Sequence, residues 1–422
     1  MCFSLSVALN RSPDSADQAF DSVDAGPTVL GESEVRADSS LQAQVADPGP
    51  QTFAVASLTD WTNALKLVGP GDTIRLTATI TSPLQYRGTG QGDGSAASGT
   101  PSEPITITAD PGVWIDPGAP GNGQVGLDIL FADHVNVTGV NIRNSQFGLR
   151  LLQVRGTEAS PVRVTGNTIT LTGHSGLIVQ GNRNNQVWSS NILVEGNTIY
   201  DTGQAGSTYG EGIYVGYGSV EWVDETSNVT IRGNEIFRTS AEGIDIKTGT
   251  KSILVENNSI HDLAPIHGGA ISAHYNSGAP NPAINDLDQV WIRGNRIWNQ
   301  NLNGVSGSND WAIWVGHGGI EITGNRIWGF RNNPAGTRAI RIRGLSDFGP
   351  FPIVIKDNVF WTAQGWVAEG APSGAALVQA SGNIGAAAAD GTTVVDRSYF
   401  PGPVPALGEA GTADAGRGRF RL

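Results

Sequence analysis

The sequence predicts an all-β protein in which short strands stack into a solenoid. The chain of 422 residues contains 57 Gly and only 15% charged residues, so coiled coils and charged helical repeats are excluded. Val, Ile and Thr are abundant, and these residues favour strands. A short strand motif also recurs through the centre of the chain, which predicts a stacked architecture.

The recurring motif alternates apolar and polar residues, ends in Gly-Asn or a near variant, and continues into an apolar residue. Its gaps range from 24 to 37 residues, because loops of different length are inserted while the strand stays constant. We expect the Asn to form a structural ladder, each bonding its equivalents on neighbouring coils. The positions are Asn167, Asn197, Asn234, Asn258, Asn295, Asn325 and Asn358.

A second short strand lies between these motifs and usually begins with Gly or Ala. Examples are Gly176–Val179, Gly212–Val215 and Gly243–Ile246. Each coil should therefore hold at least two strands, and the chain about eight or nine coils. One such unit cannot bury its apolar side alone, but stacked units form a continuous core.

An aromatic or His residue follows the Asn motif at a constant offset in six coils. We expect a structural stack at a bend of the solenoid, and a platform for sugar rings is the alternative. The six residues are Tyr200, Phe237, His261, Trp298, Trp328 and Trp361.

The chain divides into three predicted parts. Residues 1–51 are polar and acidic without periodicity, and should be disordered or a linker. Residues 52–380 form the solenoid, whose first end is capped by a short helix over 57–68, with Ser57 as its N-cap. Residues 381–422 form an Ala/Gly/Pro-rich tail.

Composition excludes several kinds of protein. The formal charge is −13, without a Lys/Arg run, which argues against a nucleic-acid partner. The single Cys excludes an intramolecular disulfide framework and Cys-based metal clusters. No apolar stretch reaches 18 residues, so no membrane-spanning segment is expected. Residues 1–10 lack the basic start and cleavage site of a signal peptide. The sequence does not indicate the oligomeric state.

The repeats and the capped opening resemble the right-handed parallel β-helix superfamily of pectate-lyase-like proteins. The resemblance covers residues 53–380. It implies a single right-handed parallel β-helix and a carbohydrate-active protein whose partner is a polysaccharide or oligosaccharide. It also implies a secreted or cell-surface location, and no organic cofactor is expected.

A parallel stack turns positions far apart in the sequence into vertical neighbours. Coils lie about 4.8 Å apart, and side chains alternate inward and outward along each strand. Equivalent outward positions on successive Gly-led strands form vertical columns. In chain order, these columns hold acids first, then a Lys and a His, then two Trp, and then three Arg. A polar surface without any site is the alternative. The residues are Glu211, Tyr214, Glu242, Asp245, Lys247, His274, Trp311, Trp314, Arg338, Arg341 and Arg343.

The three acids are expected on two adjacent coils. Carboxylates that close cannot all stay ionised without a proton or a cation. Ca²⁺ accepts several carboxylate oxygens, so Glu211, Glu242 and Asp245 are candidate metal ligands. A shared proton would instead give the acid–base pair of a glycoside hydrolase. A solvated acidic edge is the third interpretation.

The remaining residues fit β-elimination of an acidic, uronate-containing glycan. Lys247 or His274 would abstract a proton, and the acids would bind a cation or neutralise charge. The Arg residues Arg338, Arg341 and Arg343 would hold a carboxylated sugar, while Tyr214, Trp311 and Trp314 would contact sugar rings. These parts resemble those of β-helix polysaccharide lyases, and the predicted function is therefore a polysaccharide lyase.

Two other functions stay open. The first is a glycoside hydrolase or glycan transferase, of the fructan or polygalacturonan type, using paired carboxylates. Glu242-Gly-Ile-Asp245, Gly316-His317-Gly318 and Arg341-Ile-Arg343 resemble parts of the polygalacturonase motifs, but the Asp-Asp pair is missing. The Asp-Pro-His motif of the alginate epimerases is also missing. The second alternative is a non-catalytic, glycan-binding solenoid such as an adhesin or tail fibre.

Overall fold

The computed structural model describes thirteen stretches of the chain. They are residues 49–88, 96–206, 209–218, 223–247, 249–264, 269–274, 289–298, 311–316, 318–328, 338–343, 352–361, 364–369 and 378–385. Most of the predicted disordered segment 1–51 and tail 381–422 lies outside them. No helix in these stretches is long and apolar enough to cross a membrane.

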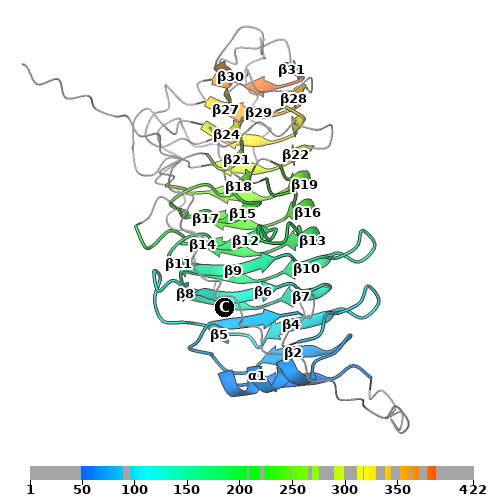
Figure 1. Cartoon of the computed structure of the whole chain (residues 1–422). Coiled ribbons are helices and arrows are strands. Elements are labelled where there is room, and N and C mark those ends of the chain that lie inside the picture. The colour runs from blue at the N-terminus through cyan, green and yellow to red at the C-terminus, as the bar shows by residue number, and fades with distance from the viewer. Residues whose placement is uncertain are drawn as a thin grey trace, which may run out of the picture.

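Three parallel sheets, each running along the whole solenoid, make up the fold (Figure 1). The first, sheet A, has 12 strands: β1 (Thr52–Val55), β2 (Thr73–Leu76), β4 (Ile105–Ala109), β7 (Val135–Thr138), β10 (Val162–Thr165), β13 (Ser190–Glu195), β16 (Ser227–Arg232), β19 (Lys251–Glu256), β22 (Val290–Arg293), β25 (Ile320–Thr323), β28 (Ile353–Lys356) and β31 (Val378–Ser381).

Sheets B and C have 10 strands each. Sheet B holds β5 (Trp114–Ile115), β8 (Asn141–Ser145), β11 (Thr168–Thr172), β14 (Thr198–Tyr200), β17 (Glu235–Phe237), β20 (Ser259–His261), β23 (Arg296–Trp298), β26 (Arg326–Trp328), β29 (Val359–Trp361) and β32 (Ile384–Gly385). Sheet C holds β3 (Leu84–Arg87), β6 (Val125–Leu130), β9 (Phe147–Leu152), β12 (Leu177–Gln180), β15 (Ile213–Val215), β18 (Ile244–Lys247), β21 (Ile271–His274), β24 (Trp311–Val315), β27 (Arg338–Arg343) and β30 (Gln364–Glu369).

The Gly-Asn motif forms a sharp bend between sheets A and B. Gly166 joins β10 to β11 with a φ of 64°, a left-handed conformation that Gly adopts without a steric penalty. In two coils the motif has no Gly, and Asn257 and Asp357 take its place with a φ of 55° each. Asn and Asp tolerate this region better than other residues with side chains. The bend explains why one sequence motif gives two strands.

The predicted Asn ladder is confirmed. The backbone N–H and the Nδ2 of Asn167 both donate to Oδ1 of Asn197, at 2.9 and 2.8 Å, and Nδ2 also donates to the carbonyl of Val137. The same bonds repeat upward to Asn383. All these Asn are buried, so the ladder satisfies polar groups at a bend that water does not reach.

The aromatic residues that follow the motif form the predicted stack on sheet B. Successive ring centroids from Tyr200 to Trp328 are 4.2 to 5.1 Å apart, and the interplanar angles are 2° to 10°. The faces of neighbouring rings therefore cover one another. Trp361 pairs with Trp328 in register, and nothing is described of its side chain.

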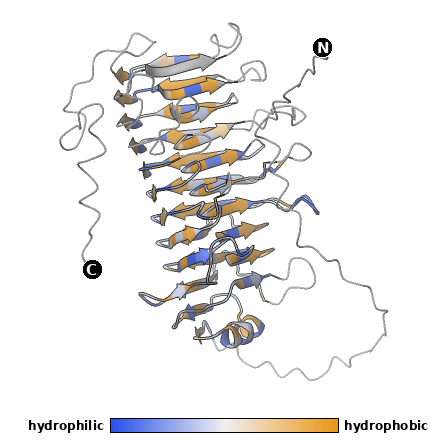
Figure 2. Cartoon of the chain, turned by 90° about the vertical axis from the view of Figure 1, so that its left-hand side faces the viewer, coloured by the Kyte–Doolittle hydropathy of each residue, from blue (hydrophilic) through white to orange (hydrophobic). Residues whose placement is uncertain are grey.

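The apolar residues of all three sheets fill one continuous interior. Ile, Leu and Val of the Gly-led strands are buried as predicted, and Figure 2 shows apolar residues on the strands of successive coils. The first end is closed by α1 (Leu58–Leu67), which buries Trp61, Ala64 and Leu65. Ser57 caps this helix by accepting a hydrogen bond from the N–H of Asp60.

The structure satisfies the prediction of at least two strands in each coil but has more coils than predicted. Each complete coil has three strands, because the segment after each Asn forms a strand of its own. Sheets of 10 and 12 strands also mean more coils than the eight or nine expected. The sheet A strands β1, β2, β4 and β7 are not followed by Gly-Asn, so the motif does not mark the coils at the first end of the solenoid. Strand β32 carries the solenoid to Gly385, slightly beyond the predicted end at 380.

Candidate functional site

The register of sheet C gathers the predicted site residues. Tyr214 of β15 pairs with Asp245 of β18, which pairs with Ser272 of β21. Lys247 pairs with His274. Glu211 and Glu242 precede β15 and β18, and the N–H of Gly212 donates to the carbonyl of Glu242 at 2.9 Å. Residues separated by some 30 positions in the chain therefore become neighbours.

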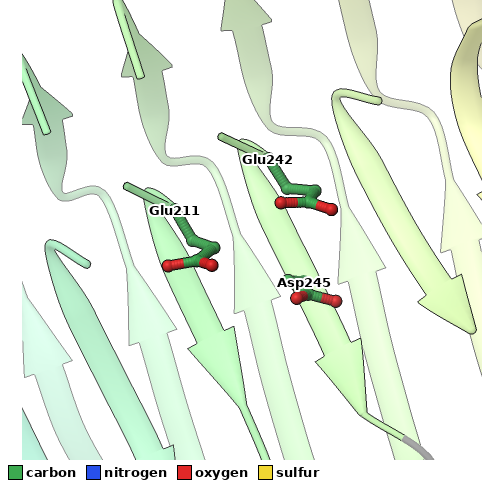
Figure 3. A group of neighbouring side chains, drawn as sticks. All are labelled: Glu211, Glu242 and Asp245. Carbon is green, nitrogen blue, oxygen red and sulfur yellow. The ribbon is translucent and has the colours of Figure 1, made fainter. Parts of the chain in front are cut away.

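Three carboxyl groups meet at this place. Ligand oxygens of Glu211, Glu242 and Asp245 all lie within 4.8 Å of one another. Figure 3 shows Glu211 and Glu242 side by side, with Asp245 farther along the strand of Glu242. All three residues are buried, with 1% to 4% of each exposed. We name these three residues the carboxyl cluster.

Hydroxyl groups from the flanking coils hold two members of the carboxyl cluster. Ser175 Oγ donates to Glu211 Oε2 at 2.6 Å, and the N–H of Gly210 donates to the same oxygen at 3.2 Å. Ser272 Oγ donates to Glu242 Oε1 at 3.4 Å. The coils on both sides thus orient the cluster from outside it. Ser175 precedes the Gly that leads into β12 and Ser272 belongs to β21, but a Ser carries no motif that marks it as a partner in the sequence.

Lys247 completes the cluster. Its Nζ lies 2.9 Å from Asp245 Oδ2, and only 10% of its side chain is exposed. The ammonium also lies 5.1 Å from the centroid of the Tyr214 ring, a cation–π distance. The Tyr214 hydroxyl accepts a hydrogen bond of 2.9 Å from the N–H of Gly218. The sequence-predicted acid, base and aromatic residue therefore form one contact group.

Burial changes the protonation of the two Glu residues. Desolvation, followed by the charge of Asp245, raises the pKa of Glu211 above its ordinary value. Desolvation and the charges of Asp245 and Glu211 raise the pKa of Glu242 well above its ordinary value. Both groups are therefore held toward the neutral form, since each carboxylate disfavours ionisation of the next.

A second group of predicted residues lies farther along the same sheet. Trp314 pairs with Arg341 in register, and the Arg341 guanidinium carbon lies 4.0 Å from the centroid of Trp311. The rings of Trp311 and Trp314 meet edge to face at 6.1 Å. Ser272 separates this Trp–Arg group from Asp245 in the column. The register therefore places a cationic, aromatic region on one side of the carboxyl cluster.

Three predicted residues are placed only by their backbone. His274 lies in register beside Lys247. Arg338 lies beside Trp311, and Arg343 belongs to the same strand, β27. Their side chains lie outside the described part of the structure, so their roles stay predictions.

Comparison with known proteins agrees with this architecture. A family model described as "Right handed beta helix region" matches residues 116–278. The crystal structure of an alginate lyase from Paenibacillus sp. strain FPU-7 superposes with a TM-score of 0.59 and 22% identity, covering 78% of this chain and 99% of the other. The chain is a right-handed parallel β-helix protein.

Other solved β-helix structures are similar at lower identity. The pectate lyase Pel9A superposes with a TM-score of 0.52 and 13% identity over 84% of this chain and 83% of that one. A surface adhesin of Streptococcus pneumoniae has a TM-score of 0.44 and 10% identity over 74% of this chain and 82% of that one. No curated protein sequence matches this β-helix protein.

The carboxyl cluster has the donor chemistry of a calcium site. Its oxygens come from three carboxyl groups within 4.8 Å of one another, and Ca²⁺ binds carboxylate oxygens at about 2.3–2.6 Å. If all three carboxyl groups were ionised beside the Lys247 ammonium, the group would carry a net charge of −2. One divalent cation or two protons would neutralise this charge.

Proposed function

We propose that this β-helix protein is a polysaccharide lyase that cleaves a uronate-containing glycan on the outward face of sheet C. The observation that carries the proposal is the buried Lys247, whose Nζ lies 2.9 Å from Asp245 and 5.1 Å from the Tyr214 ring centroid. Hydrolysis by paired carboxyls needs no amine. Elimination needs a base beside groups that neutralise the carboxylate of the sugar.

The elimination uses Lys247 and Tyr214 as a base and an acid. Lys247 Nζ, in its amine form, takes the proton from C5 of the uronate, the carbon next to the carboxylate. The electrons of that C–H bond form the C4=C5 double bond, and the bond from C4 to the glycosidic oxygen breaks. The Tyr214 hydroxyl gives its proton to the leaving oxygen. Return of the proton from Lys247 to the phenolate restores both groups.

The surroundings of Lys247 set its protonation state. Asp245 alone favours the ammonium, because an opposite charge stabilises it. We propose that the carboxyl cluster binds Ca²⁺, held by Glu211, Glu242 and Asp245. When bound there, the ion would neutralise the carboxylate of the sugar and disfavour the ammonium through like-charge repulsion. Arg341, which stacks on Trp311, would hold the carboxylate of a neighbouring sugar.

The similar structures suggest which glycans to test first. The alginate lyase and the pectate lyase share the fold with this chain at 22% and 13% identity. Both glycans consist of uronates, which is the substrate class that the Lys247 site favours. A secreted or cell-surface location would give access to such a polymer.

The test is a panel of alginate, polygalacturonate and neutral polysaccharides. Ultraviolet absorbance reports the unsaturated sugar that elimination makes, and a reducing-end assay reports every cleavage. We expect both signals on a polyuronate and neither on neutral glycans. If reducing ends appear without ultraviolet absorbance on any glycan, the assignment as a lyase is overturned. If neither signal appears, an enzymatic role on these glycans is overturned.

Variants of Lys247 connect the signal to the site. Lys247→Ala should lower the elimination rate about 10²–10⁴-fold, the range for loss of a general base. Lys247→Arg should lose as much, because Arg keeps its charge and does not deprotonate. Lys251 is the matched control, since it pairs with Glu225 at 3.2 Å from a strand of sheet A. Lys251→Ala should leave the rate unchanged.

Glycoside hydrolysis is the second candidate function, and the carboxyl cluster favours it. Carboxyls within 4.8 Å are close to the about 5–5.5 Å separation of retaining enzymes. The raised pKa of Glu242 suits a general acid, with Asp245 as the second carboxyl of the pair. In that case Glu242→Gln should abolish release of reducing ends, while Lys247→Arg should retain it.

A further inference from the structure

The outward face of sheet B carries two Arg residues in direct register. Arg296 of β23 pairs with Arg326 of β26, and neighbouring strands of a sheet lie about 4.8 Å apart. The next residues, Ile297 and Ile327, are fully buried, so alternation along each strand turns both Arg outward. Arg296 is exposed and Arg326 is half-buried. We name these two residues the Arg pair.

No acid accompanies the Arg pair in its column. Ser259 precedes Arg296, and Val359 follows Arg326. The nearest acid of this column in the described stretches is Glu235, two coils before Arg296 and therefore about 10 Å away along the solenoid. Neither Arg forms an ion pair or a hydrogen bond within the part of the chain that the structure describes. Two adjacent positive charges thus lack a counter-charge there.

Other Arg residues of this solenoid show the opposite arrangement. On sheet A, Glu195, Arg232, Glu256 and Arg293 pair in this order on four successive coils, so that acid and base alternate. Arg232 Nε lies 2.6 Å from Glu195 Oε1. Further Arg residues form ion pairs with an acid from an adjacent coil: Arg75–Asp110, Arg143–Asp116, Arg150–Asp128, Arg155–Asp133, Arg238–Asp201 and Arg293–Glu321. The Arg pair departs from this pattern.

This departure is unfavourable for the fold alone. Like charges on directly opposite residues destabilise a sheet. The aromatic stack keeps them in place, because Trp298 and Trp328, two residues farther along the same strands, stack at 5.1 Å with an interplanar angle of 9°. Residues that break a local rule without a gain in stability are candidates for function. The chemistry that the Arg pair lacks is an anion.

We propose that the Arg pair binds carboxylates of a polyuronate, which makes the outward face of sheet B a second, non-catalytic surface for the polymer cleaved on sheet C. This inference rests on the proposed function, since that function makes a uronate-containing polymer the substrate. A guanidinium holds a carboxylate through two parallel N–H···O bonds. A second contact raises the apparent affinity for a long chain and leaves that for a short one unchanged.

The test measures binding of alginate and polygalacturonate by affinity electrophoresis. A Lys247→Arg background leaves the polymer intact and keeps the buried positive charge. Arg296→Gln/Arg326→Gln should weaken binding of the long polymers about three- to tenfold, the effect of losing two exposed ion pairs, without changing the affinity for a short oligosaccharide. Arg155→Gln/Arg163→Gln removes the same charge from exposed residues elsewhere and should bind normally. In about 1 M salt the difference should vanish, because charges are then screened within about 3 Å.

A charge reversal separates binding from damage to the fold. Arg326→Glu sets an acid against Arg296 and repeats the alternation of sheet A. This variant should raise the Tm and weaken polymer binding at least as much as the double variant. Damage to the fold would lower the Tm instead. Unchanged polymer binding in Arg326→Glu would overturn the second surface.

Each outcome decides a different claim. If the double variant binds polyuronates as its parent does, or if the control variant loses equal affinity, the second surface is overturned while the lyase stands. If dextran sulfate binds through the Arg pair and polyuronates do not, the polyuronate is the wrong partner. If polyuronates bind through the Arg pair but the wild type cleaves no glycan, the enzymatic function is overturned and the binding surface remains.

Discussion

Lys247 Nζ lies 2.9 Å from Asp245 Oδ2, with 10% and 2% of the two side chains exposed. The two residues lie two positions apart on β18 and point to the same side of sheet C. The pair is the centre of a group that also contains the other two carboxyls and the Tyr214 ring. A buried ammonium requires such partners, because an unpaired charge is costly to desolvate.

Removing the ammonium should destabilise the fold. Lys247→Met leaves three carboxyls together without their counter-charge, and breaking a buried pair costs about 3–5 kcal/mol. Urea unfolding followed by circular dichroism measures the free energy of unfolding. Lys251→Met is the matched control, and its pair with the half-exposed Glu225 should be worth less than about 1 kcal/mol. Equal effects of the two variants would show that Lys247 gains nothing from the carboxyl cluster.

The Asn ladder should matter most in the middle of the solenoid. Asn234→Ala removes the acceptor of two bonds from Asn197 and the donor to Asn258 and Val194. Each buried group left unpaired costs about 1–3 kcal/mol. Asn383 ends the described ladder and accepts from Asn358, so Asn383→Ala should cost less. Thermal unfolding compares the two, and a larger loss for Asn383→Ala would contradict the ladder as the stabilising element.

The His261 position should make stability depend on pH. Burial alone lowers the pKa of His261, but the carboxylates of Asp262 at 2.7 Å and Glu235 at 3.6 Å outweigh it, and the net pKa is raised. The folded state thus binds the proton more tightly than the unfolded chain, whose His has a pKa of about 6.5. This stabilisation is complete below that value and is lost as the pH rises through the folded pKa.

His261→Phe keeps a ring between Phe237 and Trp298 and removes the titration. The unfolding free energy of the wild type should therefore fall relative to that of the variant as the pH rises from about 6 to about 9. Denaturant unfolding at a series of pH values measures it. A difference that is constant with pH would show that His261 does not carry the proton.

Calcium binding to the carboxyl cluster should release protons. The pKa values of Glu211 and Glu242 are raised by burial and by neighbouring carboxylates, so protons and Ca²⁺ compete for the same oxygens. Affinity should rise with pH, and calorimetry in buffers of different ionisation enthalpy should detect the released protons. Removal of Ca²⁺ by a chelator should lower elimination activity.

Asp245→Asn tests whether the ion binds at the cluster. It should weaken Ca²⁺ binding at least tenfold, whereas Asp133→Asn, at an exposed pair with Arg155, should not. Calcium binding without proton release, or with equal affinity in Asp245→Asn, would place the ion elsewhere.

The sequence predicts the site columns because strand alternation and stacking are periodic. Tyr214, Asp245, Ser272, Trp314 and Arg341 pair in the expected order. The third strand of each coil was missed, since the left-handed bend at the Gly-Asn motif divides one motif into two strands.

Burial and loop geometry could not be predicted from the sequence pattern. Tyr214 points outward from sheet C but is only 3% exposed, which alternation along a strand does not reveal. The ring contacts of His174 with Phe147 and Tyr209 were also missed. Tyr209 belongs to a loop insertion, and the position of its ring beside His174 depends on a backbone path without periodicity.

The mass of the products tests the central claim most directly. Elimination at Lys247 breaks the glycan without adding water, so each cleavage yields one fragment that is lighter by one water than its hydrolytic counterpart. Mass spectrometry of wild-type digests of a polyuronate should show these unsaturated fragments, and Lys247→Ala digests should not. Fragments that have all gained water would contradict the account and assign the carboxyl cluster to hydrolysis.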